Sequence, residues 1–337
     1  MIAGLLMGIA ITFFGTAPLP LVAKEAPAAK PPQKVLGFVP TDSVGPEAAS
    51  AIKKVSMPPN RIVVDLDHSG TADGVLEVSS EQPLCLGEVI GCQAVIEQAS
   101  NHSWKVAITG RQAGVKQLIE IANRRTATDA LTPVLFDRRR HNEFMKRKSE
   151  GPVGLLFLGD SITDWWPKNG KDSWAEFARY QPANFGIMAM RTEGLLWNIT
   201  QGEIDVLTPK TTVILIGVNN ILQCPDEKPE WVAAGIEKIV ATAREKMPDT
   251  KIVLMGILPA RNPASHPARA RIAAVNCLIA KLDDGKHVRF LDIGPKFLDA
   301  DGKVRRDLTG DSLHPNAKGY QVWKSALLPV ISSDAGE

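Results

Sequence analysis

Four polar side chains in the second half of the chain have the types and positions that nucleophilic catalysis needs. Ser161 stands in a Gly-Asp-Ser run, Asn219 follows Gly217, and Asp311 precedes His314 by three residues. A serine hydroxyl becomes a useful nucleophile when a base takes its proton, and imidazole titrates in a suitable pH range. A carboxylate orients such an imidazole, and amide N–H groups stabilise charge on a carbonyl oxygen. The combination is typical of hydrolases that form a covalent acyl intermediate.

The histidine follows from elimination. The chain has six histidines, which are His68, His102, His141, His266, His287 and His314. Of these, His314 has both a carboxylate three residues earlier and a position beyond the last predicted strand, so it is the candidate base. Asp160, next to the candidate nucleophile, is interpreted as structural, because an aspartate there can hold the turn through backbone hydrogen bonds.

An alternation of strands and helices after Gly151 would bring these side chains together. Short apolar runs within 155–161, 212–220, 251–259 and 288–293 indicate strands buried on both faces, hence a parallel sheet. Helical periodicity at 231–247, 270–282 and 317–331 predicts the connecting and closing helices. The pattern predicts a three-layer α/β/α domain, in which functional groups gather at the carboxyl ends of the strands.

The segment from about 137 to 333 resembles the SGNH (GDSL) hydrolases, in pattern nearest to the platelet-activating-factor acetylhydrolase-like and bacterial carbohydrate-esterase branches. The motifs that carry the resemblance stand in the family's order: GDSIT (159–163), NFGIMAMRTEGLLWNI (184–199), GVNN (217–220) and DSLHP (311–315). The resemblance implies an SGNH-hydrolase domain with a flavodoxin-like parallel sheet.

By this resemblance Ser161 is the nucleophile, His314 the base and Asp311 the acid that orients it. The backbone N–H of Ser161 and the side chain of Asn219 would line the oxyanion hole. No metal and no other cofactor is required for this chemistry. Asn220, Arg191 and Glu193 are interpreted as scaffold or rim residues.

One motif departs from the family pattern. Where the family usually has Gly-Ile-Gly-Gly-Asp, this chain has Gly186-Ile-Met-Ala-Met. The third oxyanion donor would then be the N–H of Ala189, for which a positive φ costs about 1 kcal/mol. Losing one such donor would lower the rate about 10²–10³-fold. We expect Met188 and Met190 to crowd the substrate pocket and to favour short acyl groups.

The predicted function is a serine esterase for short-chain, acetyl-type esters, with an acetylated carbohydrate as a candidate substrate. Two alternatives stay open: a membrane-associated lysophospholipase or lipid esterase, and a catalytically impaired binding module on an SGNH scaffold. A formal net charge of +2 does not indicate the strongly basic surface that binds nucleic acid, so no nucleic-acid partner is expected. Trp165, Trp166 and Trp174 are interpreted as core and rim aromatics, with stacking on a sugar as the alternative.

The chain of 337 residues also predicts several segments before the hydrolase part. Residues 1–23 contain no charged side chain and are interpreted as a signal peptide or membrane anchor, which predicts export to the periplasm or outside the cell. Membrane contact is expected only through this segment, if it is not cleaved. The remaining predicted parts are a linker (24–34), a small α+β or β-rich N-terminal domain (35–130), a connector helix (131–150) and the hydrolase domain (151–333).

The N-terminal domain has no assigned function, and residues 115–125 within it show apolar residues at helical spacing. A weak calcium candidate comes from oxygen-bearing side chains around a glycine, namely Asp65, Asp67, Ser69 and Asp73. A solvated turn explains this spacing nearly as well. The pairing of the four cysteines is left open.

Overall fold

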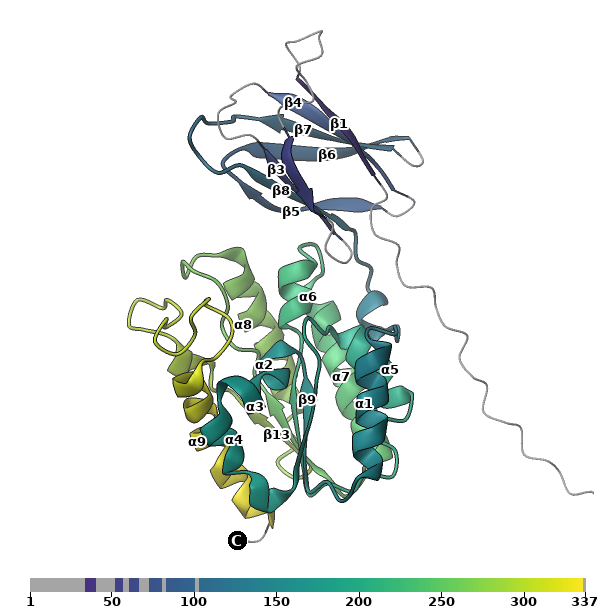
Figure 1. The fold of residues 1–337 in the computed structure, drawn as a ribbon, viewed down its shortest axis with the longest axis vertical. Helices are drawn as coiled ribbons and strands as arrows, with labels where there is room; N and C mark the ends of the chain where they lie inside the picture. The colour runs from purple at the N-terminus through teal and green to yellow at the C-terminus, as the bar shows by residue number, and fades with distance from the viewer. Residues whose placement is uncertain are drawn as a thin grey trace, which may run out of the picture.

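The structure is a computed structural model that describes residues 34–40, 52–56, 61–66, 73–80, 83–100 and 103–335 (Figure 1). The predicted signal peptide or anchor (1–23) lies outside the described residues, as do Asp67 and Ser69 of the calcium candidate. Within the described part of the chain, no helix is both long enough and apolar enough to span a membrane.

The N-terminal part consists of two four-stranded antiparallel sheets with the strand orders β1-β4-β7-β6 and β2-β3-β8-β5. The strands are β1 (Lys34–Pro40), β2 (Ile52–Ser56), β3 (Arg61–Leu66), β4 (Gly74–Ser79), β5 (Leu84–Ile90), β6 (Gln93–Ser100), β7 (Ser103–Thr109) and β8 (Leu118–Asn123). Side chains of both sheets form one apolar cluster that includes Ile62, Leu76 and Val106. Of the two architectures expected, the β-rich one is therefore present. We call this part the β-sandwich.

The prediction of a helix at residues 115–125 is wrong. These residues contain β8, which pairs antiparallel with both β3 and β5. Ile119 and Ile121 are fully buried while Leu118 and Glu120 are half-buried, which is the period of two that a strand requires. Over so short a stretch the apolar residues fit the helical period of about 3.6 as well as the strand period of two. Pairing with β3 on one side and β5 on the other favours the strand.

The C-terminal part contains a five-stranded parallel sheet with the order β10-β9-β11-β12-β13. Its strands are β9 (Leu155–Gly159), β10 (Pro182–Gly186), β11 (Thr211–Leu215), β12 (Lys251–Met255) and β13 (Val288–Leu291). The order is that of a flavodoxin-like, doubly wound sheet. It confirms the predicted α/β fold class, and the burial of every residue of β9 and β11 explains why their apolar runs in the sequence are continuous.

Helices cover both faces of this sheet. Figure 1 shows α3, α4 and α9 on one side and α1, α5 and α7 on the other, with the sheet between them. The larger helices are α1 (Arg138–Ser149), α5 (Thr192–Thr200), α7 (Pro229–Lys246), α8 (Pro267–Ile279) and α9 (Ala317–Ala335). Short helices follow the strands near the candidate site, namely α2 (Ser161–Asp164), α3 (Trp166–Asn169), α4 (Lys171–Ala175) and α6 (Val218–Gln223).

Helix α1 lies within the basic segment that was predicted to form a connector helix. Its N-cap is Asp137, whose side chain accepts a hydrogen bond from the N–H of Arg140 at 3.0 Å. Phe144 is buried and stacks on Phe185 of β10 with a centroid distance of 4.5 Å. The helix is therefore docked on the sheet through one apolar side chain, while Arg139 on its outer side stays exposed.

Candidate active site

The serine lies where the strand order of the sheet reverses. Strand β9 has β10 on one side and β11 on the other, and Ser161 opens α2 directly after β9. Ligands of doubly wound sheets bind at this topological switch point. A side chain at Gly159 would collide with the Thr163 hydroxyl and the Leu215 carbonyl, so the strand can turn this sharply into α2 only with glycine there.

Asp160 holds the turn that presents the serine. Its Oδ1 accepts a hydrogen bond from the N–H of Ile162 at 2.9 Å and so caps α2. The side chain is fully buried, and this burial raises the pKa of Asp160 to about 7, although backbone hydrogen bonds act in the opposite direction. Its contacts with the backbone agree with the structural role expected from the sequence.

The structure brings together the serine, histidine and aspartate chosen from the sequence, although 153 residues separate the first two. Ser161 Oγ lies 2.9 Å from His314 Nε2. His314 Nδ1 lies 2.6 Å from Asp311 Oδ2, and Asp311 Oδ1 accepts the N–H of His314 at 2.7 Å. Partial burial raises the pKa of Asp311, but these hydrogen bonds outweigh it, so the pKa lies below its usual value. The carboxylate is thus charged at neutral pH and can hold one ring orientation.

The loop that carries Asp311 and His314 is held in place by hydrogen bonds to a neighbouring segment. Ser312 has φ 60°, in the left-handed region, and its hydroxyl accepts a hydrogen bond from Asn262 Nδ2 at 3.1 Å. The Ser312 carbonyl accepts the N–H of Arg261 at 3.0 Å. These bonds connect the loop to the segment that follows β12, so the histidine does not depend on a mobile segment to reach the serine.

Trp165 lies against the imidazole ring. The centroids of the Trp165 and His314 rings are 4.2 Å apart, with an angle of 31° between the planes. Such a contact limits rotation of the imidazole. Trp166 is fully buried in the core, where it stacks on Trp323. Sequence reasoning named Trp165 but did not connect it with His314.

The turn after β10 keeps the shape that the glycine motif would give it. Ala189 has φ 62°, and the N–H of Met190 donates to the carbonyl of Ile187 at 3.1 Å. The N–H of Ile187 donates to the carbonyl of Gly159 at 3.1 Å, which ties the turn to the end of β9. The alanine therefore adopts the positive φ, at a cost of about 1 kcal/mol.

The two methionines of this turn behave differently, and one prediction about them is wrong. Met190 is fully buried in the core, with its sulfur against Gly194, so it does not crowd a substrate pocket. Met188 is 60% exposed. The apolar side chain at position 190 was expected in the cleft because the family has a short acid there, but the adjacent helix α5 offers it a core contact. For Met188 a place in the pocket stays a prediction.

Asn219 lies on α6 next to this turn. Its Nδ2 donates to the carbonyl of Met190 at 2.9 Å, and its Oδ1 accepts a hydrogen bond from Gln223 Nε2 at 3.0 Å. The preceding Gly217 has φ 118°, a conformation that favours glycine and starts α6 immediately after β11. The amide predicted from the sequence thus lies beside the turn of Ala189, on the serine's edge of the sheet.

A buried polar cluster supports this edge, and sequence reasoning found only part of it. Arg191 Nε donates to Glu193 Oε1 at 2.6 Å, and Arg125 donates to Glu193 at 3.0 Å and to Glu227 at 3.2 Å. Asn220 Nδ2 donates to both carboxylates at 3.3 Å. Burial raises the pKa of Glu193, but the two guanidinium groups outweigh it and hold the pKa below its usual value. The one signal in the sequence is Glu193, a charge at the start of an otherwise apolar helix.

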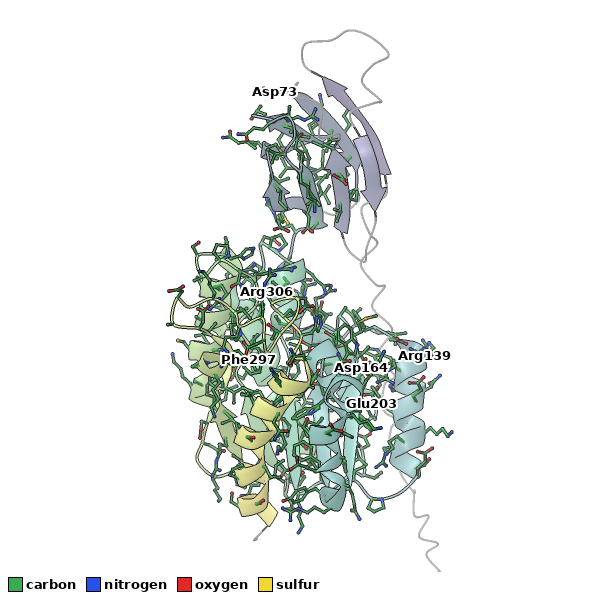
Figure 2. All side chains as sticks on the ribbon, turned by 60° about the vertical axis from the view of Figure 1, so that its left-hand side comes forward. Asp73, Arg139, Asp164, Glu203, Phe297 and Arg306 are labelled. Carbon is green, nitrogen blue, oxygen red and sulfur yellow. The ribbon has the colours of Figure 1, made fainter. Side chains whose placement is uncertain are left out.

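The described part of the calcium candidate gives it no support. Asp65 lies within β3, and Asp73 Oδ1 accepts the N–H of Gly110 at 2.9 Å. Figure 2 places Asp73 in the β-sandwich, away from the parallel sheet. Among the residues that the structure describes, no group of three or more histidine, cysteine, aspartate or glutamate side chains could hold a metal ion.

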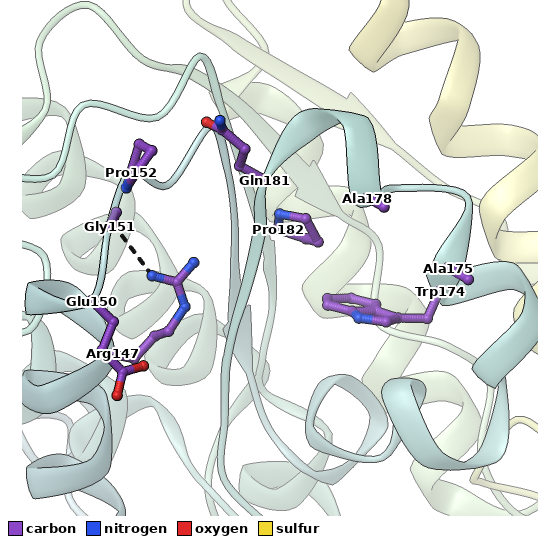
Figure 3. Close-up of a pocket in the computed structure, with 9 residues that line it drawn as sticks. All are labelled: Arg147, Glu150, Gly151, Pro152, Trp174, Ala175, Ala178, Gln181 and Pro182. Atoms are coloured by element: carbon purple, nitrogen blue, oxygen red, sulfur yellow. Dashed lines mark hydrogen bonds between the residues drawn. The ribbon is translucent and has the colours of Figure 1, made fainter.

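One hollow of the surface lies at the opposite edge of the sheet from Ser161. It has a volume of about 560 Å³ and lies between Gly151–Pro152, before β9, and Gln181–Pro182, at the start of β10 (Figure 3). Arg147, which donates to the Gly151 carbonyl at 3.4 Å, and Trp174 lie in its wall. Because the reactive side chains lie at the carboxyl ends of the strands, we take that edge and not this hollow as the site.

A doubly wound sheet with a hydrogen-bonded serine and histidine at its carboxyl edge is the architecture of a class of hydrolases that act on ester bonds. The chain belongs to the GDSL-like lipase/acylhydrolase family, whose model matches residues 157–322. It is therefore an ester-bond hydrolase, and the resemblance seen in the four sequence motifs is confirmed.

The named relatives are acetylhydrolases. The chain is 30% identical to the human platelet-activating factor acetylhydrolase IB subunit alpha1 over 203 residues, which cover 58% of this chain and 85% of that protein. It is 33% identical to the alpha2 subunit from Rattus norvegicus over 183 residues, which cover 54% of this chain and 77% of that protein. A solved structure from Bacteroides fragilis, assigned provisionally as an acylhydrolase, aligns with a TM-score of 0.50 and 22% identity over 59% of this chain and 98% of that one. That structure supports the fold of the C-terminal part.

Proposed function

We propose that this hydrolase cleaves short-chain, acetyl-type esters through an acyl-enzyme on Ser161. The observation that carries the proposal is the 2.9 Å contact between Ser161 Oγ and His314 Nε2, continued by the 2.6 Å contact between His314 Nδ1 and Asp311. In this arrangement the imidazole can accept the hydroxyl proton while the carboxylate stabilises the imidazolium that results.

In the first half-reaction Ser161 Oγ attacks the ester carbonyl and its proton passes to His314 Nε2. The tetrahedral oxyanion accepts hydrogen bonds from the N–H groups of Ser161 and Ala189 and from Asn219 Nδ2. When the intermediate collapses, the ester C–O bond breaks and His314 returns the proton to the departing alkoxide. In the second half-reaction water attacks the acyl carbon and gives a proton to His314. The bond between the acyl carbon and Ser161 Oγ then breaks, and His314 returns the proton to Oγ, which releases the acid and regenerates the serine.

The preference for a short acyl group is supported by the names of the relatives, which are acetylhydrolases. With Met190 in the core, any crowding of the acyl pocket comes from other side chains, and Met188 is the exposed candidate.

The test is hydrolysis of p-nitrophenyl esters of increasing acyl length by the wild type and by Ser161→Ala. We expect rates that fall steeply beyond about butyrate, and a loss of at least about 10⁴-fold in the variant at every length. Labelling with a fluorophosphonate should modify Ser161 in the wild type and leave Ser161→Ala unlabelled. Equal rates in the two proteins, or a wild type that takes no label, would end the proposal and favour the binding module.

A second candidate is an acetyl ester carried on a phospholipid. The specific observation in its favour is that the two relatives are acetylhydrolases named for platelet-activating factor. Turnover of a short-acyl phospholipid measured beside turnover of an acetylated xylo-oligosaccharide separates the two substrates. A lysophospholipid with one long acyl chain is the third arm, and preferential turnover of it would contradict the acetyl preference.

We also propose that the chain works outside the cytoplasm, because residues 1–23 form an apolar stretch of the length of a signal sequence. Fractionation of cells that express the full chain, with N-terminal sequencing of the product, tests this. Recovery of uncleaved, cytoplasmic protein would contradict export, and uncleaved protein in the membrane fraction would favour the anchor.

A further inference from the structure

Asn219 is held by a side chain that the mechanism above does not use. Gln223 lies one helical turn further along α6, and its Nε2 donates to Asn219 Oδ1 at 3.0 Å. The other end of the same amide, Gln223 Oε1, accepts a hydrogen bond from Arg191 Nη1 at 3.2 Å. Arg191, Gln223 and Asn219 therefore form a continuous hydrogen-bonded chain that ends beside the Ala189 turn.

The direction of this chain is fixed at both ends by groups that cannot reverse their roles. A guanidinium has donors and no acceptor, so Arg191 must donate and Gln223 must present its oxygen to it. The amide nitrogen of Gln223 is then left to face Asn219, which must accept through Oδ1. At the far end the carbonyl of Met190 can only accept, and it receives a hydrogen bond from Asn219 Nδ2 at 2.9 Å. Both constraints select the same orientation of the Asn219 amide.

The start of the chain is buried and firmly held. Arg191 is 5% exposed and its Nε donates to Glu193 Oε1 at 2.6 Å, while Arg125 holds the same carboxylate at 3.0 Å. A buried, ion-paired guanidinium keeps its charge and loses little additional freedom when it orients a neighbour. The orientation of the Gln223 amide is therefore fixed by Arg191.

We infer that Gln223 is a positioning residue, which holds Asn219 in the orientation that presents to the substrate the N–H of Nδ2 not used by the Met190 carbonyl, and not the side-chain oxygen. The inference rests on the proposed role of Asn219 as an oxyanion donor. The reversed amide would place Oδ1 toward a developing negative charge, which would turn a stabilising contact into a repulsive one. The orientation is thus set before substrate arrives, and its benefit appears only when charge develops in the transition state.

The main test is Gln223→Glu, a change of almost the same shape. A carboxylate at this position can still accept from Arg191 but cannot donate to Asn219 Oδ1, and it attracts Asn219 Nδ2 through a charge-assisted bond. We expect kcat on p-nitrophenyl acetate to fall about 10²-fold with KM changed less than about threefold, as for loss of a transition-state contact. Gln201→Glu is the matched control, because Gln201 is exposed at the far end of α5, and it should leave kcat within about twofold of wild type.

A double-mutant cycle shows whether Gln223 acts through Asn219. If it does, Gln223→Glu combined with Asn219→Ala is no slower than Asn219→Ala alone, because the group being positioned is already absent. Losses that multiply would overturn the inference, and so would a Gln223→Glu variant with wild-type kcat. If Asn219→Ala itself keeps wild-type kcat, the oxyanion assignment fails instead, which is a separate result.

A second variant keeps the test meaningful if the new charge disturbs folding. Gln223→Met removes both hydrogen bonds without adding charge, and we expect a smaller loss of kcat, about tenfold, since Met190 still accepts from Asn219. Thermal unfolding of each variant is measured beside the kinetics. A loss of kcat in Gln223→Met that persists at full effect in the Asn219→Ala background indicates a merely structural role and contradicts the inference.

Discussion

The β-sandwich and the parallel sheet each have a core of buried apolar side chains, but their buried polar side chains lie in different places. In the β-sandwich two buried polar side chains bond to each other within one loop, where Arg111 Nε donates to Gln117 Oε1 at 2.6 Å. In the parallel sheet buried polar side chains gather where strands end, among them Ser161, Glu193 and Asn219. Parallel strands all end at the same edge, whereas antiparallel neighbours end at opposite edges. The comparison teaches that strand direction decides which part of the chain can assemble a catalytic group.

The two regions meet in one buried cluster of charges. Arg125 follows β8, the last strand of the β-sandwich, by two residues, and its side chain reaches Glu193 and Glu227 of the parallel-sheet part. Its backbone N–H also donates to Asp226 Oδ2 at 2.9 Å. The segment between the regions is therefore anchored at its start, and through Glu193 it touches the arginine that begins the hydrogen-bonded chain to Asn219.

The largest expected effect comes from the carboxyl edge. His314→Ala removes the base, and we expect kcat to fall at least about 10⁴-fold while the free energy of unfolding changes by less than about 1 kcal/mol. Esterase assays and urea denaturation of the same preparation measure the two quantities. A variant that loses stability in proportion to its activity would show that this edge is structural, and the contrast between the regions would disappear.

Removing the charge that joins the regions should cost stability. In Arg125→Met the buried carboxylates of Glu193 and Glu227 lose a shared cation, and we expect the free energy of unfolding to fall by about 3–5 kcal/mol. Adding Glu227→Gln should return more than half of this loss, because it restores the balance of charge. Arg124→Met, at the exposed neighbouring position, is the control and should be neutral. Equal losses in the two arginine variants would contradict an electrostatic origin.

A cavity in the core of the β-sandwich should have the opposite effect to His314→Ala, because it should lower stability and leave activity unchanged. Leu76 is fully buried in that core, and Leu76→Ala should lower the stability of the β-sandwich by about 2–5 kcal/mol without changing kcat. Calorimetry of the full chain should show the shift in one transition and leave the other in place. Parallel loss of esterase activity below the unfolding temperature would mean that the β-sandwich takes part in catalysis directly.

The smallest effect concerns the alanine with φ 62°. Ala189→Gly relieves the left-handed strain, and we expect a gain of up to about 1 kcal/mol in the free energy of unfolding, reduced by the greater freedom of glycine in the unfolded chain. The activity should stay within about threefold of wild type, because the backbone N–H is kept. A gain of 100-fold or more in kcat would instead show that the alanine turn impairs the natural enzyme.

Sequence reasoning was strongest where chemistry and periodicity agreed. Ser161, Asn219 and the Asp311–His314 pair were placed at the carboxyl edge because each follows a predicted strand, and the structure brings them to one edge. Sequence reasoning failed for β8, where the helical and the strand periods fit equally well, because the local sequence does not show which strands will pair with it. It also failed for Met190, because the choice between core and cleft depends on the helix packed against it.

The supporting residues were harder to find for a related reason. Gln223, Glu227 and Arg125 have ordinary spacings in the sequence, and their roles arise from contacts between segments up to 102 residues apart. Trp165 was named from its type, but its contact with His314 depends on the loop that Ser312 and Asn262 hold. Reactive side chains can be recognised by type and local motif, whereas the groups that orient them are defined by the folded contact.

The last helix of the chain is attached to the helices that follow the nucleophile. Tyr320 Oη donates to the carbonyl of Ile162 at 2.8 Å, and Trp323 stacks on Trp166 with a centroid distance of 4.3 Å. Tyr320 is made 158 residues after Ile162, so a chain emerging from the ribosome carries its serine well before these two contacts can form. We expect esterase activity to appear only after α9 has been made and has docked, and a fluorogenic ester added during synthesis would report that moment in real time.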